Sequence, residues 1–194
     1  MYHTALLSVS NKSGIVPFAK VLHTHGIKII STGGTAELLC QNNIPVLPIS
    51  SYTGFPEIMG GRVKTLHPKV FGGILARRHL PGDMKDLEAI GGQPIDIVVV
   101  NLYPFEKMSE EKIPEDRLLE YIDIGGVSLI RAAAKNYQDV IVLIDPSDYE
   151  VIVKYIQQNK EIPIEIRKQL ALKAFRRTYM YDKAIYETLT NYSL

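Results

Sequence analysis

Short apolar runs alternate with longer stretches of mixed polarity along this chain, and the alternation predicts its secondary structure. Five apolar runs read as β-strands, at residues 5–9, 27–30, 46–49, 95–100 and 140–144. The fourth is rich in β-branched residues and continues without a polar position from Ile97 to Val100. A continuous run of this kind is typical of a parallel strand that is covered on both faces.

Helical patterns lie between the apolar runs, at residues 13–25, 35–42, 127–135 and 148–158. The first pattern puts Ile15, Phe18 and Leu22 on one face, and Gly26 follows as a stop signal. We expect Ser147 to cap the helix at 148–158. The regular alternation of strand and helix predicts an α/β fold with a doubly wound, mainly parallel sheet in a Rossmann-like three-layer arrangement.

Two regions interrupt this alternation. Residues 50–82 are crowded with glycine and proline, and we expect an irregular segment there that is functional or mobile. Residues 163–189 read as one long helix that no strand follows. We therefore predict a single domain over residues 1–194, with the sheet core in residues 1–145 and a C-terminal helical extension in residues 146–194.

Polar residues follow the first two strands, where parallel α/β sheets bind their ligands. The exits carry Ser10, Asn11, Lys12, Thr32, Gly33, Gly34 and Thr35. Both exits open a helix, whose first N–H groups and dipole favour a phosphate. Neither matches the glycine patterns that bind NAD or ATP, so we expect a smaller phosphate ester. An ordinary helix cap and a tight structural turn are the alternatives.

The stretch from residue 58 to residue 82 contains no acidic residue. Its cations are Arg62, Lys64, Lys69, Arg77 and Arg78. A local cation excess in a nearly neutral chain suggests an anionic ligand, whereas a solvated basic loop is the alternative.

The later strand exits add further candidates. Asn101 and Tyr103 follow the fourth strand, and Asp123 precedes a glycine pair that opens an alanine-rich helix. Lys135 lies about three turns along that helix, at 3.6 residues per turn. Its side chain points either across the site or into water, and spacing alone does not decide between them.

Composition narrows the class of protein. The chain has 194 residues, 46% of them hydrophobic, and a formal net charge of +1. These values favour a folded domain and argue against a dedicated nucleic-acid binder. No apolar run approaches the ~18–20 residues of a membrane span. The single cysteine, Cys40, excludes a disulfide scaffold, favours a cytoplasmic location and is expected in the core. The histidines show no metal-ligand spacing.

Eight stretches resemble, in the same order, the IMP cyclohydrolase domain of the bifunctional purine-biosynthesis family that also carries AICAR transformylase. They are residues 5–14, 31–36, 53–57, 60–68, 73–77, 101–105, 122–127 and 131–136. The resemblance implies a methylglyoxal-synthase-like fold and closure of the formylated ribonucleotide FAICAR to IMP with loss of water. It also implies that no cofactor or metal takes part, and that the protein is a homodimer.

The resemblance also implies site residues. The implied nucleotide-binding positions are Ser10, Asn11, Lys12, Thr32, Gly33, Gly34, Thr35, Arg62, Val63, Lys64, Thr65, Val100, Asn101, Asp123 and Ile124. Lys135 is implied as the proton-transfer residue, paired with Asp123. Our hypothesis adds that Lys64 and Tyr103 stabilise the oxyanion that develops during ring closure.

Two other readings stay open. Methylglyoxal synthase shares the sheet and the phosphate-binding turn, and an effector-binding module such as the regulatory domain of carbamoyl-phosphate synthetase needs only the phosphate turns. The joint presence of Lys64, Tyr103, Asp123 and Lys135 favours the cyclohydrolase. The family usually continues into a larger transformylase domain. The chain is thus a stand-alone cyclohydrolase or a truncated bifunctional protein, with a separate or fused transformylase as the implied partner.

Overall fold

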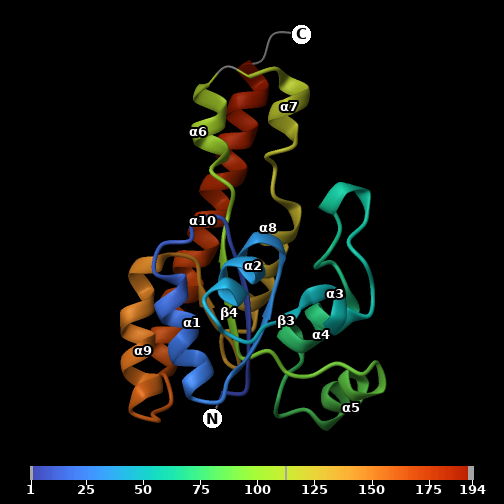
Figure 1. The fold of residues 1–194 in the computed structure, drawn as a ribbon. Coiled ribbons are helices and arrows are strands. Elements are labelled where there is room, and N and C mark those ends of the chain that lie inside the picture. The colour runs from blue at the N-terminus through green and yellow to red at the C-terminus, as the bar shows by residue number, and fades with distance from the viewer. Residues whose placement is uncertain (1, 112, 192–194) are drawn as a thin grey trace.

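A five-stranded parallel sheet forms the centre of the computed structural model, which describes residues 2–111 and 113–191 (Figure 1). The strands are β1 (Thr4–Val9), β2 (Lys28–Ser31), β3 (Leu47–Pro48), β4 (Ile97–Asn101) and β5 (Ile141–Leu143). Their order is β3-β2-β1-β4-β5, so the chain builds outward from β1 first in one direction and then in the other. The carboxyl ends of β1 and β4 therefore meet at the point where the direction reverses.

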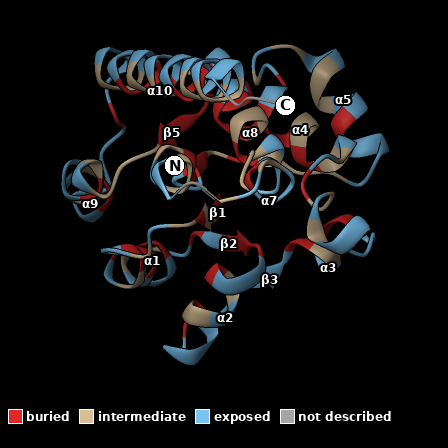
Figure 2. Ribbon diagram, turned by 90° about the horizontal axis from the view of Figure 1, so that it is seen from above, coloured by how far each residue is buried: buried red, intermediate tan, exposed pale blue. Residues whose placement is uncertain are grey.

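Helices cover both faces of this sheet (Figure 2). One face carries α1 (Ile15–Thr24) and α9 (Tyr149–Gln157), with α2 (Gly33–Gln41) beside α1, and the other carries α4 (Pro68–Leu75) and α8 (Ile124–Lys135). The long helix α10 (Ile164–Asn191) lies along the β5 edge, where it packs against β5, α8 and α6. The arrangement confirms the predicted doubly wound α/β fold.

Shorter elements complete the chain. They are α3 (Ile49–Thr53), the 3-10 helix η1 (Met59–Gly61), α5 (Pro81–Ala89), α6 (Phe105–Glu110), α7 (Glu115–Leu119) and the 3-10 helix η2 (Pro146–Asp148). The β-branched run of β4 is buried over its whole apolar length, as expected for a strand covered on both faces. Among the described residues, no helix combines the length and apolar character that a membrane span requires.

The segment predicted as irregular is partly helical. It contains α3, η1, α4 and the start of α5. The glycines of this segment suggested a loop, but Gly73 lies inside α4. A Cβ atom added at Gly73 would come within 2.5 Å of the Gln93 carbonyl oxygen. This glycine serves close packing rather than a loop. The predicted strand at residues 46–49 also shrinks to β3, because Ile49 turns inward as the first residue of α3.

Two smaller predictions were wrong. Ser147 does not cap a helix; it lies within η2, and its N–H donates to the Asp145 carboxylate at 2.8 Å. Asp145, two residues earlier, is therefore a capping residue, and it caps η2 rather than α9. Cys40 lies on the outer side of α2 and is exposed rather than part of the core.

The long tail helix is confirmed, but it buries only part of its apolar surface. Leu170 and Tyr181 join the central core, whereas Leu172, Phe175 and Tyr179 are exposed. The homodimer that would cover such side chains stays a prediction.

Candidate functional site

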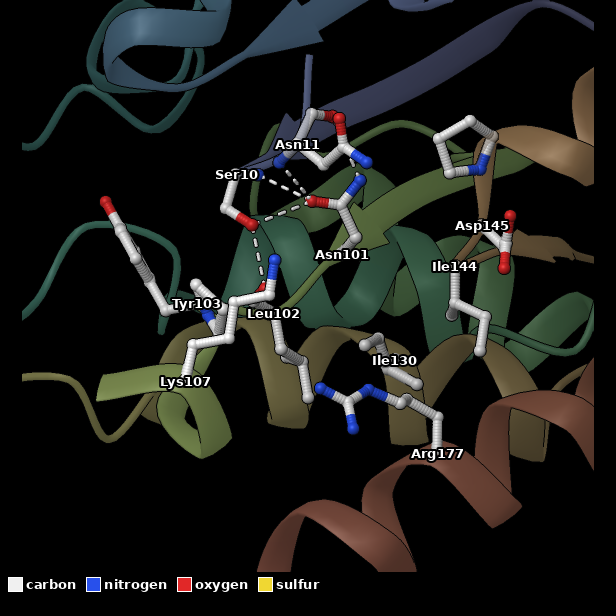
Figure 3. A pocket seen from close by; sticks show the side chains of 12 residues that line it. Ser10, Asn11, Asn101, Leu102, Tyr103, Lys107, Ile130, Ile144, Asp145 and Arg177 are labelled. Carbon is white, nitrogen blue, oxygen red and sulfur yellow. Dashed lines mark hydrogen bonds between the residues drawn. The ribbon is translucent and has the colours of Figure 1, made fainter. Parts of the chain in front are cut away.

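An open cavity of about 670 Å³ lies at the carboxyl ends of β1, β4 and β5. Its lining residues are Ser10, Asn11, Asn101, Leu102, Tyr103, Pro104, Lys107, Ile130, Ile144, Asp145, Pro146 and Arg177. Figure 3 shows Ser10, Asn11 and Asn101 on one side of it and Lys107 and Arg177 on the other. Binding crevices of open α/β sheets lie at this type of position, beside the reversal of strand order.

The Asn101 side chain ties the first strand exit to the fourth. Its Oδ1 accepts the N–H groups of Ser10 at 2.7 Å and Asn11 at 2.8 Å. Its Nδ2 donates to the Asn11 carbonyl at 3.2 Å, and the Ser10 hydroxyl lies 2.7 Å from the Leu102 carbonyl. One amide therefore fixes the loop after β1 against the end of β4.

The turns after β1 and β2 also meet. Thr35 Oγ1 accepts the Val9 N–H at 3.1 Å and lies 2.8 Å from Lys12 Nζ, which also donates to the Val9 carbonyl. The Ser8 and Thr32 hydroxyls are 2.7 Å apart. Burial lowers the pKa of Lys12, and the charge of Glu37 opposes this shift. Lys12 thus braces the two turns, and the start of α2 presents its first N–H groups beside them.

Asp123 caps α8 and is largely buried. Its Oδ1 accepts the Gly126 N–H at 2.7 Å, and a Cβ at Gly126 would approach Oδ2 to 2.5 Å, so a side chain there would displace the Asp123 carboxyl. Burial raises the pKa of Asp123, while hydrogen bonds from the Gly126 and Tyr103 backbones and the charge of Lys64 oppose the rise. A carboxyl with a raised pKa therefore lies at the start of α8, within the electrostatic influence of Lys64.

The segment after η1 supplies the remaining predicted positions. Lys64 Nζ lies 3.6 Å from a Glu57 carboxylate oxygen, and Arg62 pairs with Glu120 on the surface. Thr65 is buried against α8, since a Cβ on Gly125 would come within 2.8 Å of its Oγ1. Val63 forms a bridge with Ile58, Val100 is buried in β4, and the side chains of Tyr103 and Ile124 are exposed.

Lys135 is the one predicted site residue that the structure separates from the others. It is the last residue of α8, whereas Asp123 is the cap at the start of that helix. Twelve residues at 1.5 Å each separate the two by about 18 Å along the axis. Lys135 is exposed at the amino edge of the sheet, where its neighbour Asn136 bonds to the Ile74 carbonyl. The pairing of Asp123 with Lys135 within one chain is therefore wrong.

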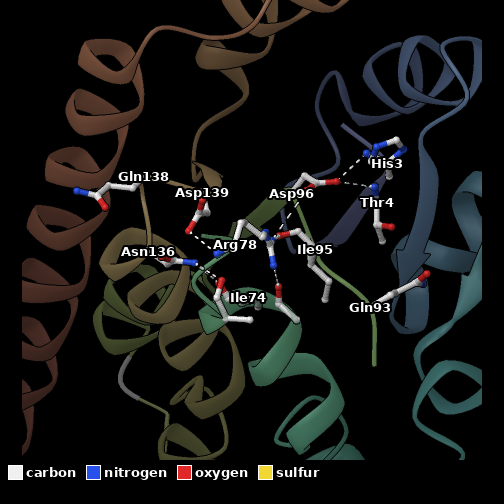
Figure 4. A network of polar contacts seen from close by, with 12 residues as sticks. His3, Thr4, Ile74, Arg78, Gln93, Ile95, Asp96, Asn136, Gln138 and Asp139 are labelled. Carbon is white, nitrogen blue, oxygen red and sulfur yellow. Dashed lines mark hydrogen bonds and ion pairs between the residues drawn. The ribbon is translucent and has the colours of Figure 1, made fainter. Parts of the chain in front are cut away.

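The cation excess of residues 58–82 is also divided between the two edges, and Figure 4 shows Arg78 at the amino edge beside Asp96 and Asp139. Arg62 and Lys64 lie near Asp123, but Arg77 pairs with Asp83 and Arg78 lies between Asp96 and Asp139 at the amino edge. An anionic ligand at the carboxyl edge would meet only the first two of these arginines and lysines.

Sequence reasoning missed four residues at the carboxyl edge. They are Lys107, Asp145, Arg177 and Tyr181. Asp145 directly follows the fifth apolar run, so the rule that polar residues follow strand exits would have found it. Arg177 and Tyr181 carried no such signal, because their positions depend on where α10 crosses the sheet edge. In the described ranges, no three His, Cys, Asp or Glu side chains cluster as metal ligands.

Comparison with known proteins now adds to this geometry. Residues 14–128, more than half of the chain, match the model of the MGS-like domain. The chain belongs to the MGS-like domain family. Residues 133–193 match a second model, that of the AICARFT/IMPCHase bienzyme. The two matches together confirm the family resemblance of the sequence.

The chain spans little more than a third of the length of the curated relatives that it matches. It is 51% identical over 189 residues to the bifunctional purine biosynthesis protein PurH of Persephonella marina, and 49% identical over 188 residues to that of Bacillus subtilis. These alignments cover 97% and 96% of the chain but 37% of each relative. The crystal structure of ForH is 36% identical, with a TM-score of 0.82, and the match covers 97% of this chain and 100% of ForH.

Proposed function

We propose that this MGS-like protein is an IMP cyclohydrolase of purine biosynthesis, which closes FAICAR to IMP with loss of water. The PurH relatives and the match to the bienzyme model support the purine pathway. The observation that carries the specific reaction is the part-buried Asp123 carboxyl at the start of α8, whose raised pKa is opposed by the charge of Lys64.

The reaction forms a bond from the carboxamide nitrogen to the formyl carbon and breaks the bond from that carbon to its oxygen. The oxygen leaves as water, with one hydrogen from the carboxamide nitrogen and one from the formamide nitrogen. The carboxamide nitrogen is a weak nucleophile, so a catalyst needs a proton acceptor beside it. It also needs donors that stabilise negative charge on the formyl oxygen.

Asp123 is the proposed proton acceptor. Its carboxyl is largely buried and its pKa is raised, which makes it a better base than an exposed aspartate. Lys64 is the proposed partner of the developing oxyanion, because its charge acts at the same place. Tyr103 is a second proposed oxyanion donor, and its exposed side chain is free to turn toward a ligand.

The remaining predicted positions are proposed to bind the nucleotide. The monophosphate would meet the N–H groups of Gly33 and Gly34 at the start of α2, where the helix dipole favours an anion. Ser10, Asn11 and Asn101 would hold the middle of the ligand, through groups that already form one hydrogen-bonded unit. Lys12 supports these turns from within, as its bonds to Thr35 and Val9 indicate.

The test is IMP formation from FAICAR, followed by ultraviolet absorbance without folate. We compare the wild type with Asp123→Asn, which keeps an acceptor for the α8 cap. We expect kcat to fall by about 10²–10⁴-fold, the usual size of a general-base contribution. Asp139→Asn is the matched control, since Asp139 accepts a backbone N–H from Arg78 at the opposite edge, and it should stay within about twofold of the wild type.

Two outcomes would contradict the proposal. A folded wild type that binds IMP but forms none from FAICAR would indicate an effector-binding module. Turnover of a triose phosphate in place of FAICAR would indicate a methylglyoxal synthase.

A further inference from the structure

Tyr181 lies in the middle of α10 and is completely buried. Its hydroxyl accepts the Asp123 N–H at 2.8 Å and donates to the Tyr121 carbonyl at 3.0 Å. Burial raises the pKa of Tyr181 to about 12, so the hydroxyl keeps its proton and can make both bonds. A single side chain of α10 therefore holds the turn that leads into the cap of α8.

The aromatic ring of Tyr181 is itself held by the segment after β4. It meets the Phe105 ring edge-on, with 6.2 Å between centroids and 70° between planes. The Arg177 guanidinium lies 5.6 Å from the Tyr181 centroid and pairs with Glu106. Phe105 and Glu106 follow Tyr103 closely, and the Tyr103 backbone bonds to the Asp123 carboxyl. Tyr181 thus contacts both chain segments that surround this carboxyl.

We propose that Tyr181 is a positioning residue for ring closure, which fixes the backbone of Asp123 so that its carboxyl faces the substrate. This inference rests on the proposed function. It assigns a role in the site to the helical extension, because Tyr181 lies beyond residues 14–128, the part that matches the MGS-like domain. A bare MGS-like sheet would lack this hydrogen bond.

Tyr181→Phe tests the proposal, because it removes the hydroxyl and keeps the ring. Tyr2→Phe is a closely matched control: the Tyr2 hydroxyl also accepts a backbone N–H, from Ile162 at 2.8 Å, but near the start of β1 at the far edge. Both variants remove the acceptor of one backbone N–H at 2.8 Å, and Tyr181→Phe also loses the bond to the Tyr121 carbonyl. The urea midpoint should therefore fall in both variants, and somewhat more in Tyr181→Phe.

We expect Tyr181→Phe to lower kcat about tenfold with KM within about twofold of the wild type, because a misplaced base affects the chemical step. Tyr2→Phe should leave both constants within about twofold. In the Asp123→Asn background, Tyr181→Phe should cause no further loss of kcat, because the group that it positions is already gone. A purely structural role would lower activity in both backgrounds alike.

A second readout does not depend on turnover. Deuterium uptake of residues 121–126 should rise in Tyr181→Phe and stay unchanged in Tyr2→Phe. If the wild type forms IMP but Tyr181→Phe matches it in kcat, the inference is overturned while the proposed function stands. If the wild type forms no IMP, the proposed function fails, and unchanged uptake at residues 121–126 would reject the positioning contact as well.

Discussion

The two edges of the sheet use polar residues in opposite ways. At the amino edge, Arg78 is largely enclosed, and its guanidinium donates to the carbonyls of Gly73 at 3.1 Å and Ile95 at 3.0 Å (Figure 4). Asp96 accepts the N–H groups of His3 and Thr4 nearby. These groups satisfy one another within the protein, so the edge is closed.

At the carboxyl edge, polar groups line an open cavity even where they bond to one another, as Ser10, Asn11 and Asn101 do. Tyr103 is 56% exposed, and Lys107 lies on the cavity wall. Asp123 is part-buried, and among the described residues no arginine pairs with it as Arg78 pairs with Asp96. The comparison teaches that charged residues alone do not mark a binding site; what matters is whether the fold has already provided their partners.

The largest expected effect at the closed edge is on stability. Arg78→Ala should lower the free energy of unfolding by about 3 kcal/mol, because two buried carbonyls each lose a guanidinium donor and Asp96 loses its ion-pair partner. Urea unfolding measures this loss, and kcat of the folded fraction should stay within about twofold. Arg77→Ala, in an exposed pair with Asp83, should leave the urea midpoint unchanged. A strong loss of kcat in folded Arg78→Ala would break the contrast between the edges.

The opposite pattern is expected for Lys64→Ala at the open edge. Loss of an oxyanion donor should lower kcat by about 10²-fold, whereas the urea midpoint should barely move, because Lys64 is only part-buried. Lys69→Ala is the matched control, since the Lys69 ammonium lies near Gly91 and away from Asp123. Equal losses of activity in the two variants would argue against the assigned role of Lys64.

The third prediction concerns pH. Burial raises the pKa of Asp123 above 3.8. Asp123 can act as a base only when its carboxyl is deprotonated. We therefore expect kcat/KM to fall about tenfold per pH unit below the raised pKa. Between 3.8 and that pKa the folded protein binds more protons than the unfolded chain, so the free energy of unfolding should decrease as pH rises. Asp123→Asn should abolish both dependences. If kcat/KM of Asp123→Asn still falls at low pH, the fall must come from the titration of another group.

The smallest effect is expected for Lys135→Ala. Lys135 is exposed at the closed edge, about 18 Å along α8 from the Asp123 cap, so turnover should stay within about twofold. The family resemblance implies the opposite, a loss of turnover far greater than the loss of binding. Steady-state kinetics of this variant therefore separates the two assignments directly.

The sequence predicted much of the scaffold, because buried parallel strands leave continuous apolar runs and polar residues gather where those runs end. The meeting of Ser10, Asn101 and Thr35 follows from that rule together with the strand order. The separation of Asp123 from Lys135 was also within reach, since it needs only the rise of a helix.

Other features could not be read from the sequence. The acidic partners of Arg78 are Asp96 and Asp139, which lie far along the chain. The sequence around Arg78 therefore suggested that its charge was available to bind an anionic ligand. The bond between Tyr181 and Asp123 spans 58 residues and depends on where α10 crosses the edge of the sheet. Such contacts are set by the packing of whole elements, and local periodicity does not encode them.

The position of Tyr181 in the sequence has a consequence for synthesis. The ribosome completes the turns after β1 and β2, the Lys64 segment and α8 before α10 emerges, so a nascent chain carries nearly every group of the proposed site before Tyr181 can bond to Asp123. On the proposal made above, ring-closing activity is then acquired late and almost at once, when α10 docks onto β5 and α8. Binding of the nucleotide, which relies on the earlier turns, would precede it.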